Sequence, residues 1–278
     1  MRRIAITIAV VFLAASAVTI QAQETGAVSS VSIPVALRSQ ADCTGFIASP
    51  SVPPDVFVVG GADDDFHSVV RQFVQGESVF ISHHKGGEFA VGAEYSVIRP
   101  ANELFRTMHY QGERWDIRKL GIPYEDVAQV KVTHVNPEGA VAKVTFSCGS
   151  VFPGDTLVPF QPRPNPHYAI SYPLDHFAPL DQNKQHGRIT ASHNNFGFLG
   201  QGTVVYLNLG EKDGAQPGQR FRIYKVLPRH ATGFMSSAPT PPETIGEAVV
   251  LSVQGKSCAA MVVSSYREIS AGDYVEKE

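Results

Sequence analysis

Few side chains in this sequence have the types and spacing needed for chemistry. The chain contains ten histidines, and the acidic run Asp63–Asp65 is followed by His67. Carboxylates and imidazoles together can bind a divalent metal ion. However, adjacent residues such as His83 and His84 point to opposite faces of an extended chain, and the sequence has no HExxH, CxxC or twelve-residue calcium-loop motif. We therefore predict a solvated acidic loop here and no metal site.

Catalytic signatures of other kinds are also missing from the sequence. It has no Gly-x-Ser-x-Gly elbow, no phosphate-binding GxxxxGK[ST] loop and no GxGxxG after a strand. The 23 basic residues are outnumbered by 26 acidic ones, for a net charge of −3, so the positive surplus of a nucleic-acid-binding protein is absent. We expect a protein that is not an enzyme, needs no cofactor and binds no nucleic acid.

The best candidate for a ligand-binding surface is the segment from Met108 to Asp116. It holds the only tryptophan, Trp115, with three further candidate ligand-binding residues: His109, Tyr110 and Arg114. Aromatic rings concentrate binding energy in a small area, which suits a sugar ring or a partner side chain. The alternative is that Trp115 folds back and caps the domain beneath it.

The three cysteines suggest a disulfide more than a reactive thiol. An exported chain reaches an oxidising compartment, where disulfides persist. Cys43 and Cys148 are the candidate pair, because a bridge between them would tie the N-terminal strands to the end of the first module described below. Cys258 lies beside Ala259, Ala260 and Met261, which indicates a buried small residue.

The first 22 residues have the pattern of a secretory signal peptide. Arg2 and Arg3 precede a mostly apolar run from Ile4 to Val18, and Ala22 is a small residue at a plausible cleavage point, with Ala17 as the alternative. About 20 apolar residues are needed to cross a membrane, so this run is short for a permanent span. We expect export to the periplasm or the cell exterior. Cleavage would leave 21 basic and 26 acidic residues, a net charge of −5.

An internal repeat is the strongest pattern in the sequence. Gly76 and Gly92, each followed by an apolar strand-like stretch, recur as Gly202 and Gly218, both 126 positions later. Gly154-Asp155 recurs as Gly272-Asp273, 118 positions later. The first copy therefore carries a connection eight residues longer, which falls between Arg99 and Val127. We interpret residues 76–160 and 186–278 as two copies of one module.

Each copy has the pattern of β-structure. Apolar residues alternate with polar ones, as in Val130 and Val132 with Lys131 between them, which is the period of a half-buried strand. Glycine-centred turns separate the short strands, and the Pro-rich stretch Val158–His167 favours an extended linker. Only Asp63–Phe73 has the pattern of a short helix. The fold class expected is mainly β, with two tandem small β-barrel or sandwich modules.

These patterns predict five regions along the chain. They are a signal peptide at 1–22, a flexible leader at 23–40, a first β-module at 41–160 that begins with a pair of strands at 41–75, a Pro-rich linker at 161–185 and a second β-module at 186–278.

The glycine-centred turns, the long loop and the closing Gly-Asp strand together resemble small β-modules of bacterial envelope proteins. In particular, they are similar to the C-terminal domain of flagellar assembly protein T. That resemblance implies a non-enzymatic element that binds or assembles with other envelope components, and it assigns no functional residue.

The sequence therefore supports three hypotheses of different classes. The first is an exported, non-enzymatic binding or assembly adaptor for a cell-envelope protein. The second is a peptidoglycan- or polysaccharide-binding module that uses Trp115, Tyr110 and Arg114. The third, with the least support, is a secreted metal-dependent hydrolase at Asp63–His67. After signal cleavage no part of the chain is expected to span a membrane.

Overall fold

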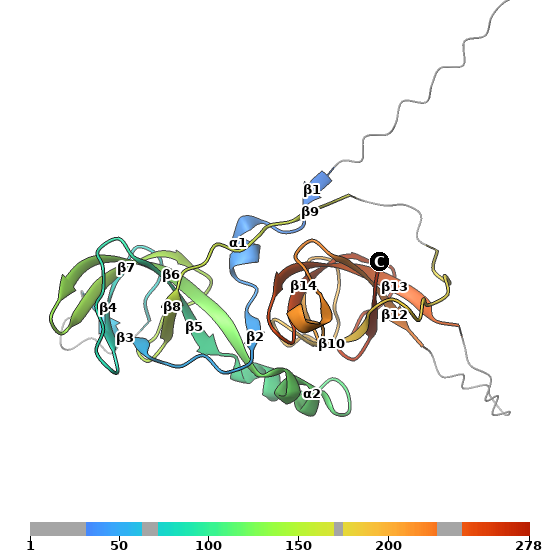
Figure 1. The fold of residues 1–278 in the computed structure, drawn as a ribbon, viewed down its shortest axis with the longest axis horizontal. Helices are drawn as coiled ribbons and strands as arrows, with labels where there is room; N and C mark the ends of the chain where they lie inside the picture. The colour runs from blue at the N-terminus through green and yellow to red at the C-terminus, as the bar shows by residue number, and fades with distance from the viewer. Residues whose placement is uncertain (1–31, 63–71, 170–174, 227–240) are drawn as a thin grey trace, which may run out of the picture. The chain divides into compact units, whose positions relative to one another are not determined.

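The computed structural model describes residues 32–62, 72–169, 175–226 and 241–278, and its β-strands form two closed antiparallel barrels of six strands each (Figure 1). The strand order of the first barrel is β3-β4-β7-β6-β5-β8, and β8 pairs with β3 to close it. Its strands are β3 Val56–Gly61, β4 Ser78–His83, β5 Glu94–Pro100, β6 Ile122–Asn136, β7 Gly139–Ser147 and β8 Thr156–Pro159.

The second barrel has the same topology. Its strand order is β10-β11-β14-β13-β12-β15, with β15 closing onto β10. Its strands are β10 His186–Ser192, β11 Val204–Leu207, β12 Arg220–Lys225, β13 Glu243–Val253, β14 Cys258–Ser265 and β15 Tyr274–Lys277, with a short 3-10 turn, η2, at Glu211–Asp213. The order matches the first barrel strand for strand, so the expectation of two tandem small β-modules is confirmed as two barrels.

Backbone details follow the spacing of the sequence repeat. Gly76 and Gly202 both have positive φ, 98° and 84°, which favours glycine in these turns. Gly76 N–H donates to Val144 O at 2.9 Å, and Gly202 N–H donates to Val262 O at 2.8 Å. The register of β5 on β6 shifts after Val97, and that of β12 on β13 shifts after Ile223, 126 positions later. The two barrels therefore share turns and strand irregularities as well as topology.

Segments outside the barrels differ in part from the sequence-based expectations. The sequence predicts a pair of strands within residues 41–75. The two strands found there, β2 Phe46–Ala48 and β3, do not pair with each other. Instead β2 extends the first barrel's sheet at β6, because β3 is needed between β4 and β8 to close the ring. The predicted leader contributes β1 Ser32–Pro34 and helix α1 Arg38–Asp42, and β1 pairs with β9 His167–Ala169 of the predicted linker.

Helices were largely missed by the sequence patterns. Besides α1, the long connection of the first copy forms a 3-10 turn, η1 Asn102–Phe105, and helix α2 Glu113–Leu120. Most of the one stretch expected to be helical, residues 63–71 of Asp63–Phe73, lies outside the described residues, and Phe73 forms an isolated bridge with Val151.

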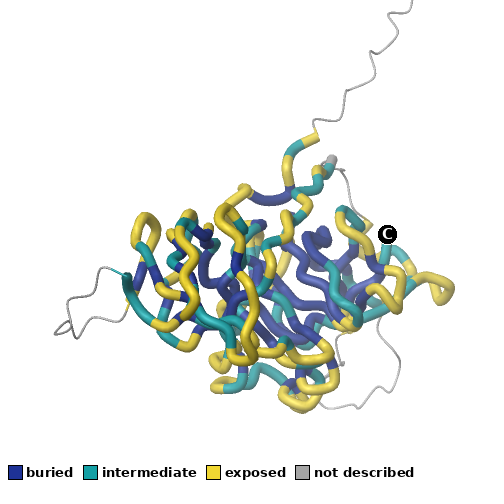
Figure 2. The backbone as a smooth tube through the Cα atoms, turned by 60° about the vertical axis from the view of Figure 1, so that its left-hand side comes forward, coloured by how far each residue is buried: buried dark blue, intermediate teal, exposed yellow. Residues whose placement is uncertain are grey.

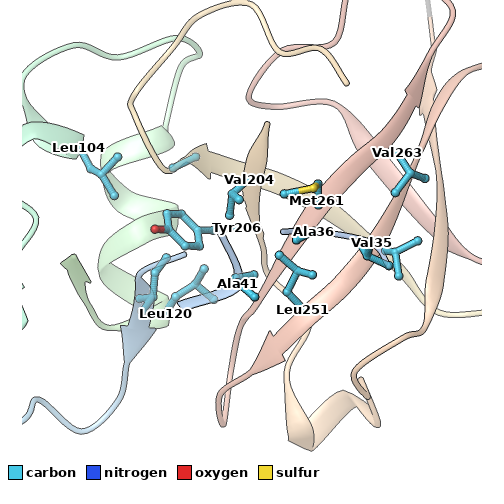
Figure 3. Packing of buried hydrophobic residues seen from close by; sticks show 14 of the residues in the cluster. Val35, Ala36, Ala41, Leu104, Leu120, Val204, Tyr206, Leu251, Met261 and Val263 are labelled. Carbon is cyan, nitrogen blue, oxygen red and sulfur yellow. The ribbon is translucent and has the colours of Figure 1, made fainter. Parts of the chain in front are cut away.

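Three large apolar clusters hold the described structure together. Figure 2 shows which stretches of the backbone are buried. One fills the first barrel around Val79 and Val97, and another fills the second barrel around Val205 and Phe221. The third cluster lies between the barrels. There the outward-facing side chains of β13 and β14 are covered by the segment that contains α1 and by α2, as Figure 3 shows. Its members include Val35, Ala41, Leu104, Leu120, Tyr206, Leu251, Met261 and Val263.

Candidate functional site: the exposed face of helix α2

The predicted ligand-binding segment divides into a part that anchors helix α2 and a part that faces solvent. His109 and Tyr110 belong to the anchoring part. His109 Nε2 lies 3.0 Å from Asn195 Oδ1. The guanidinium carbon of Arg188 lies over the Tyr110 ring, 5.5 Å from the ring centroid. Both partners belong to the second copy. These two rings therefore hold the long connection of the first copy, between Arg99 and Val127, against the second barrel.

Tyr110 is further held by an acidic neighbour. Its hydroxyl donates to Asp116 Oδ2 at 3.1 Å. Burial raises the pKa of the Tyr110 hydroxyl well above its ordinary value, and the nearby charge of Asp116 raises it further. Tyr110 therefore stays protonated and acts as a neutral donor, which suits a positioning role in the fold.

The start and end of helix α2 are set by local chemistry. Glu113, which is fully buried, accepts hydrogen bonds from the backbone N–H groups of His109 and Tyr110. Gly121 follows the last helical residue with φ 144°, and a Cβ at this position would lie 2.0 Å from Ala48 O. Acidic residues in the first turn and basic residues in the last also suit the helix dipole. The sequence therefore fixes both ends of α2.

One face of α2 is apolar and packs into the cluster between the barrels. Ile117 and Leu120 are buried there. The remaining face carries Trp115, whose side chain is 64% exposed, and three cations. These residues, which we call the α2 face, are Arg114, Trp115, Arg118 and Lys119.

Trp115 lies among cations on this face. Lys119 Nζ is 5.6 Å from the centre of its ring, a cation–π arrangement, and Arg114 Nη2 donates to Phe105 O at 3.1 Å. The alternative in which Trp115 caps the barrel is not what the structure shows, because Ile117 and Leu120 occupy the buried side of the helix. The ring is available to a partner.

Further positive charge borders the α2 face. Lys256 Nζ, from the second barrel, donates to Lys119 O at 3.4 Å. Two acidic residues lie on the same helix. Glu113 is fully buried, and the half-buried Asp116 contacts Tyr110, Arg188 and, at 3.9 Å, Lys119 Nζ. The local excess of cations contrasts with the acidic composition of the whole chain.

A groove of about 410 Å³ runs beside the helix on the second-barrel side. Its lining includes Asp116, Lys119, His186, Arg188, Asn208 and Tyr274. Arg188 lies 4.9 Å from the centre of the Tyr274 ring, and its Nη2 donates to the Tyr274 hydroxyl at 2.9 Å. Tyr274 is the aromatic side chain of this groove, and Lys119, which lies over the Trp115 ring, belongs to its lining.

Sequence reasoning identified part of this surface and missed the rest. It selected Trp115 and Arg114, which are exposed, together with His109 and Tyr110, which are engaged in anchoring. It missed Arg118 and Lys119. The signal was present, because positions 115, 118 and 119 lie on one side of a helix while Ile117 and Leu120 lie on the other.

The cysteines occupy the places that the sequence suggested. Cys43 and Cys148 form a disulfide with a Cα–Cα distance of 5.6 Å, which joins the end of α1 to the chain just after β7. Cys258 is a free thiol buried inside the second barrel, and burial raises its pKa. A thiol held in its protonated form is a poor nucleophile.

The acidic run Asp63–Asp65 and His67, considered above as metal ligands, lie outside the described residues. Within the ranges that the structure describes, no three His, Cys, Asp or Glu side chains are grouped closely enough to hold a metal ion. A helix with the length and apolarity of a membrane span is likewise not found among the described residues.

Comparison with known proteins gives no relative for this chain: no protein-family model matches it, and a search of curated proteins finds none similar.

Proposed function

We propose that the protein is an exported, non-enzymatic adaptor that binds an acidic protein of the cell envelope through the α2 face. The observation that carries this proposal is the exposed Trp115 surrounded by Arg114, Arg118 and Lys119 on a helix whose other side is buried. An aromatic ring supplies contact area, and the cations supply attraction to carboxylates.

The position of the helix supports the proposal. α2 is held by the buried Ile117 and Leu120, and through Tyr110 and His109 by the second barrel. A contact surface on a fixed helix costs less ordering on binding than one on a free loop. The N-terminal signal pattern and the resemblance to envelope assembly modules, both predictions from the sequence, point to a partner in the envelope.

The experiment that tests the proposal is chromatography of envelope proteins on immobilised mature protein, residues 23–278. Three forms are compared: the wild type, the variant Arg114→Glu/Arg118→Glu/Lys119→Glu, and the control Lys131→Glu/Lys143→Glu, which alters exposed lysines on β6 and β7. We expect the wild type and the control to retain an acidic protein that elutes as salt rises, because surface charge attraction is screened. Equal retention by all three forms, or equal loss from both variants, contradicts the proposal.

A second candidate function is binding of a peptidoglycan or polysaccharide strand beside α2. The groove that contains Tyr274 and Arg188 favours it, since aromatic rings stack on sugar rings, and Lys119 of the α2 face is part of its lining. Fluorescence of the single tryptophan distinguishes the two. A shift on addition of soluble murein fragments supports this second function, and a flat titration contradicts it.

A further inference from the structure

A second groove lies at the opposite end of β10 from the one beside α2. It has a volume of about 710 Å³, within the usual size of ligand pockets. Its walls come from residues 99–107 of the first copy, from Glu125, and from residues 193–196 of the second copy. None of the candidate residues on the α2 face contributes to it.

The positive and negative side chains that line this groove are equal in number and pair with nearby residues. Arg99 bonds to both carboxylate oxygens of Asp155, at 2.7 and 2.6 Å, and contacts Glu125 at 3.3 Å. Arg106 pairs with Glu103 at 3.0 Å. Burial lowers the pKa of His193, which favours its neutral form. The groove therefore has no surplus charge that would select an anion or a cation.

Uncommitted polar side chains line the same walls. The side chains of Asn102, Thr107 and Asn194 make no hydrogen bond to any other described residue. Amide groups both donate and accept, and a hydroxyl does the same. Such groups match a ligand whose own groups both donate and accept, which is the chemistry of a sugar hydroxyl.

An exposed aromatic ring stands at the edge of the groove. Phe196 lines it with 54% of its surface exposed. The turn that carries Phe196 is fixed, because Ser192 Oγ accepts from Phe196 N–H at 2.9 Å and His109 holds Asn195. The ring is therefore presented on a preorganised turn, where a sugar can stack on it without further ordering.

We infer that this groove binds a neutral carbohydrate chain, with Phe196 as the stacking surface and Asn102, Thr107 and Asn194 as hydrogen-bonding groups. The site is separate from the α2 face and does not depend on the proposed adaptor function. It places sugar binding between the second copy's β10–β11 loop and residues 102–107 of the first copy, neither of which the sequence patterns selected.

The test uses calorimetric titration with neutral oligosaccharides of three linkage types: chito-, cello- and malto-oligosaccharides. Wild-type protein is expected to bind at least one of them. Phe196→Ala should weaken that binding about tenfold or more, since it removes both the stacking of the ring on the sugar and the desolvation that accompanies it. The control is Phe198→Ala, which removes a more exposed ring, 74% exposed, that does not line the groove.

A second pair of variants reports on the site directly. In a Trp115→Phe background, Phe196→Trp places a single fluorophore at the groove and Phe198→Trp places one two residues away. Sugar should change the emission of the first variant and leave the second unchanged. Absence of binding by the wild type to all three sugars, or equal loss in Phe196→Ala and Phe198→Ala, overturns the inference. Retention of sugar binding by Trp115→Ala separates this site from the α2 face.

Discussion

The two barrels have the same topology and turns, but they differ on the outer face of one pair of strands. This face is polar and exposed in the first barrel, and apolar and buried in the second. On β6 and β7 of the first barrel, Lys131 lies opposite Lys143, and both are exposed. At the equivalent positions of β13 and β14, Val249 lies opposite Met261, and both are buried. One barrel therefore presents this face to water, and the other uses it to pack against α1 and α2.

This difference shows which part of a duplicated module is constrained by its fold. The interior residues and the turn glycines remain similar because either barrel needs them to close. The outer face is free to change, and in the second copy it has become the core that joins the two barrels. The functional candidate, α2, lies in the connection that is eight residues longer in the first copy, and it covers this face of the second barrel.

The largest expected effect on stability comes from placing a charged residue on the buried outer face of the second barrel. Val249→Lys should reduce the free energy of unfolding by about 4 kcal/mol or more, because it buries an unpaired charge. The mirror change Lys131→Val should alter it by less than about 1 kcal/mol, since it removes only an exposed ion pair with Glu94. Urea denaturation measures both. Similar losses in the two variants would contradict the difference between the barrels.

The disulfide joins α1 to the first barrel, while Cys258 of the second barrel is a free thiol, and loss of the disulfide should be the next largest effect. Cys43→Ala/Cys148→Ala opens a link across a sequence separation of 105 residues and should cost about 2–5 kcal/mol. Thermal unfolding with and without a reductant checks this, and the reductant should not affect the double variant. The native protein should leave Cys258 unlabelled by a thiol reagent, whereas rapid labelling would contradict its burial.

The turn glycines of the two barrels should behave alike when they are replaced. A Cβ at Gly76 or Gly202 meets no atom within 4 Å, so the cost of Gly76→Ala or Gly202→Ala comes from the positive φ alone. Each should lose about 1–2 kcal/mol. Urea denaturation tests this, provided that the dependence of the unfolding free energy on urea concentration is the same in both variants, so that the midpoints can be compared. A large cost at one site and none at the other would mean that the two turns are not equivalent.

The smallest expected effect on stability is that of Trp115→Ala. The side chain is 64% exposed, so its removal should change the free energy of unfolding by no more than about 0.5 kcal/mol. The same variant should lose the acidic partner in the chromatography described above. A strongly destabilised Trp115→Ala would show that the ring is part of the fold and would remove it as a contact residue.

The sequence predicted the strands and turns well because their signals are local. Alternating apolar residues and recurrent glycines define each barrel whatever surrounds it. The joining of the barrels was missed, although the apolar run Ala248–Leu251 is typical of a strand buried on both faces. Helix α2 was missed because eight residues give a weak periodic signal, and its stability comes from packing Ile117 and Leu120 against distant parts of the chain.

The candidate site was predicted only in part for the same reason. Trp115 and Arg114 stand out by residue type, and the structure exposes both. The roles of His109 and Tyr110 depend on Asn195 and Arg188, which lie more than 70 residues away in the sequence. Contacts of that range leave no pattern in a single sequence, so anchoring residues and contact residues could not be separated beforehand.

Site-specific photo-crosslinking in intact cells of the native organism tests directly whether the protein contacts its partner through α2. A photoreactive phenylalanine analogue is placed either at Trp115 or at Phe80, which is 41% exposed on β4 of the first barrel. We expect that position 115 captures an acidic envelope protein, that Arg118→Glu/Lys119→Glu abolishes this product, and that position 80 gives none. The same product from both positions, or a product from position 80 alone, would contradict this expectation.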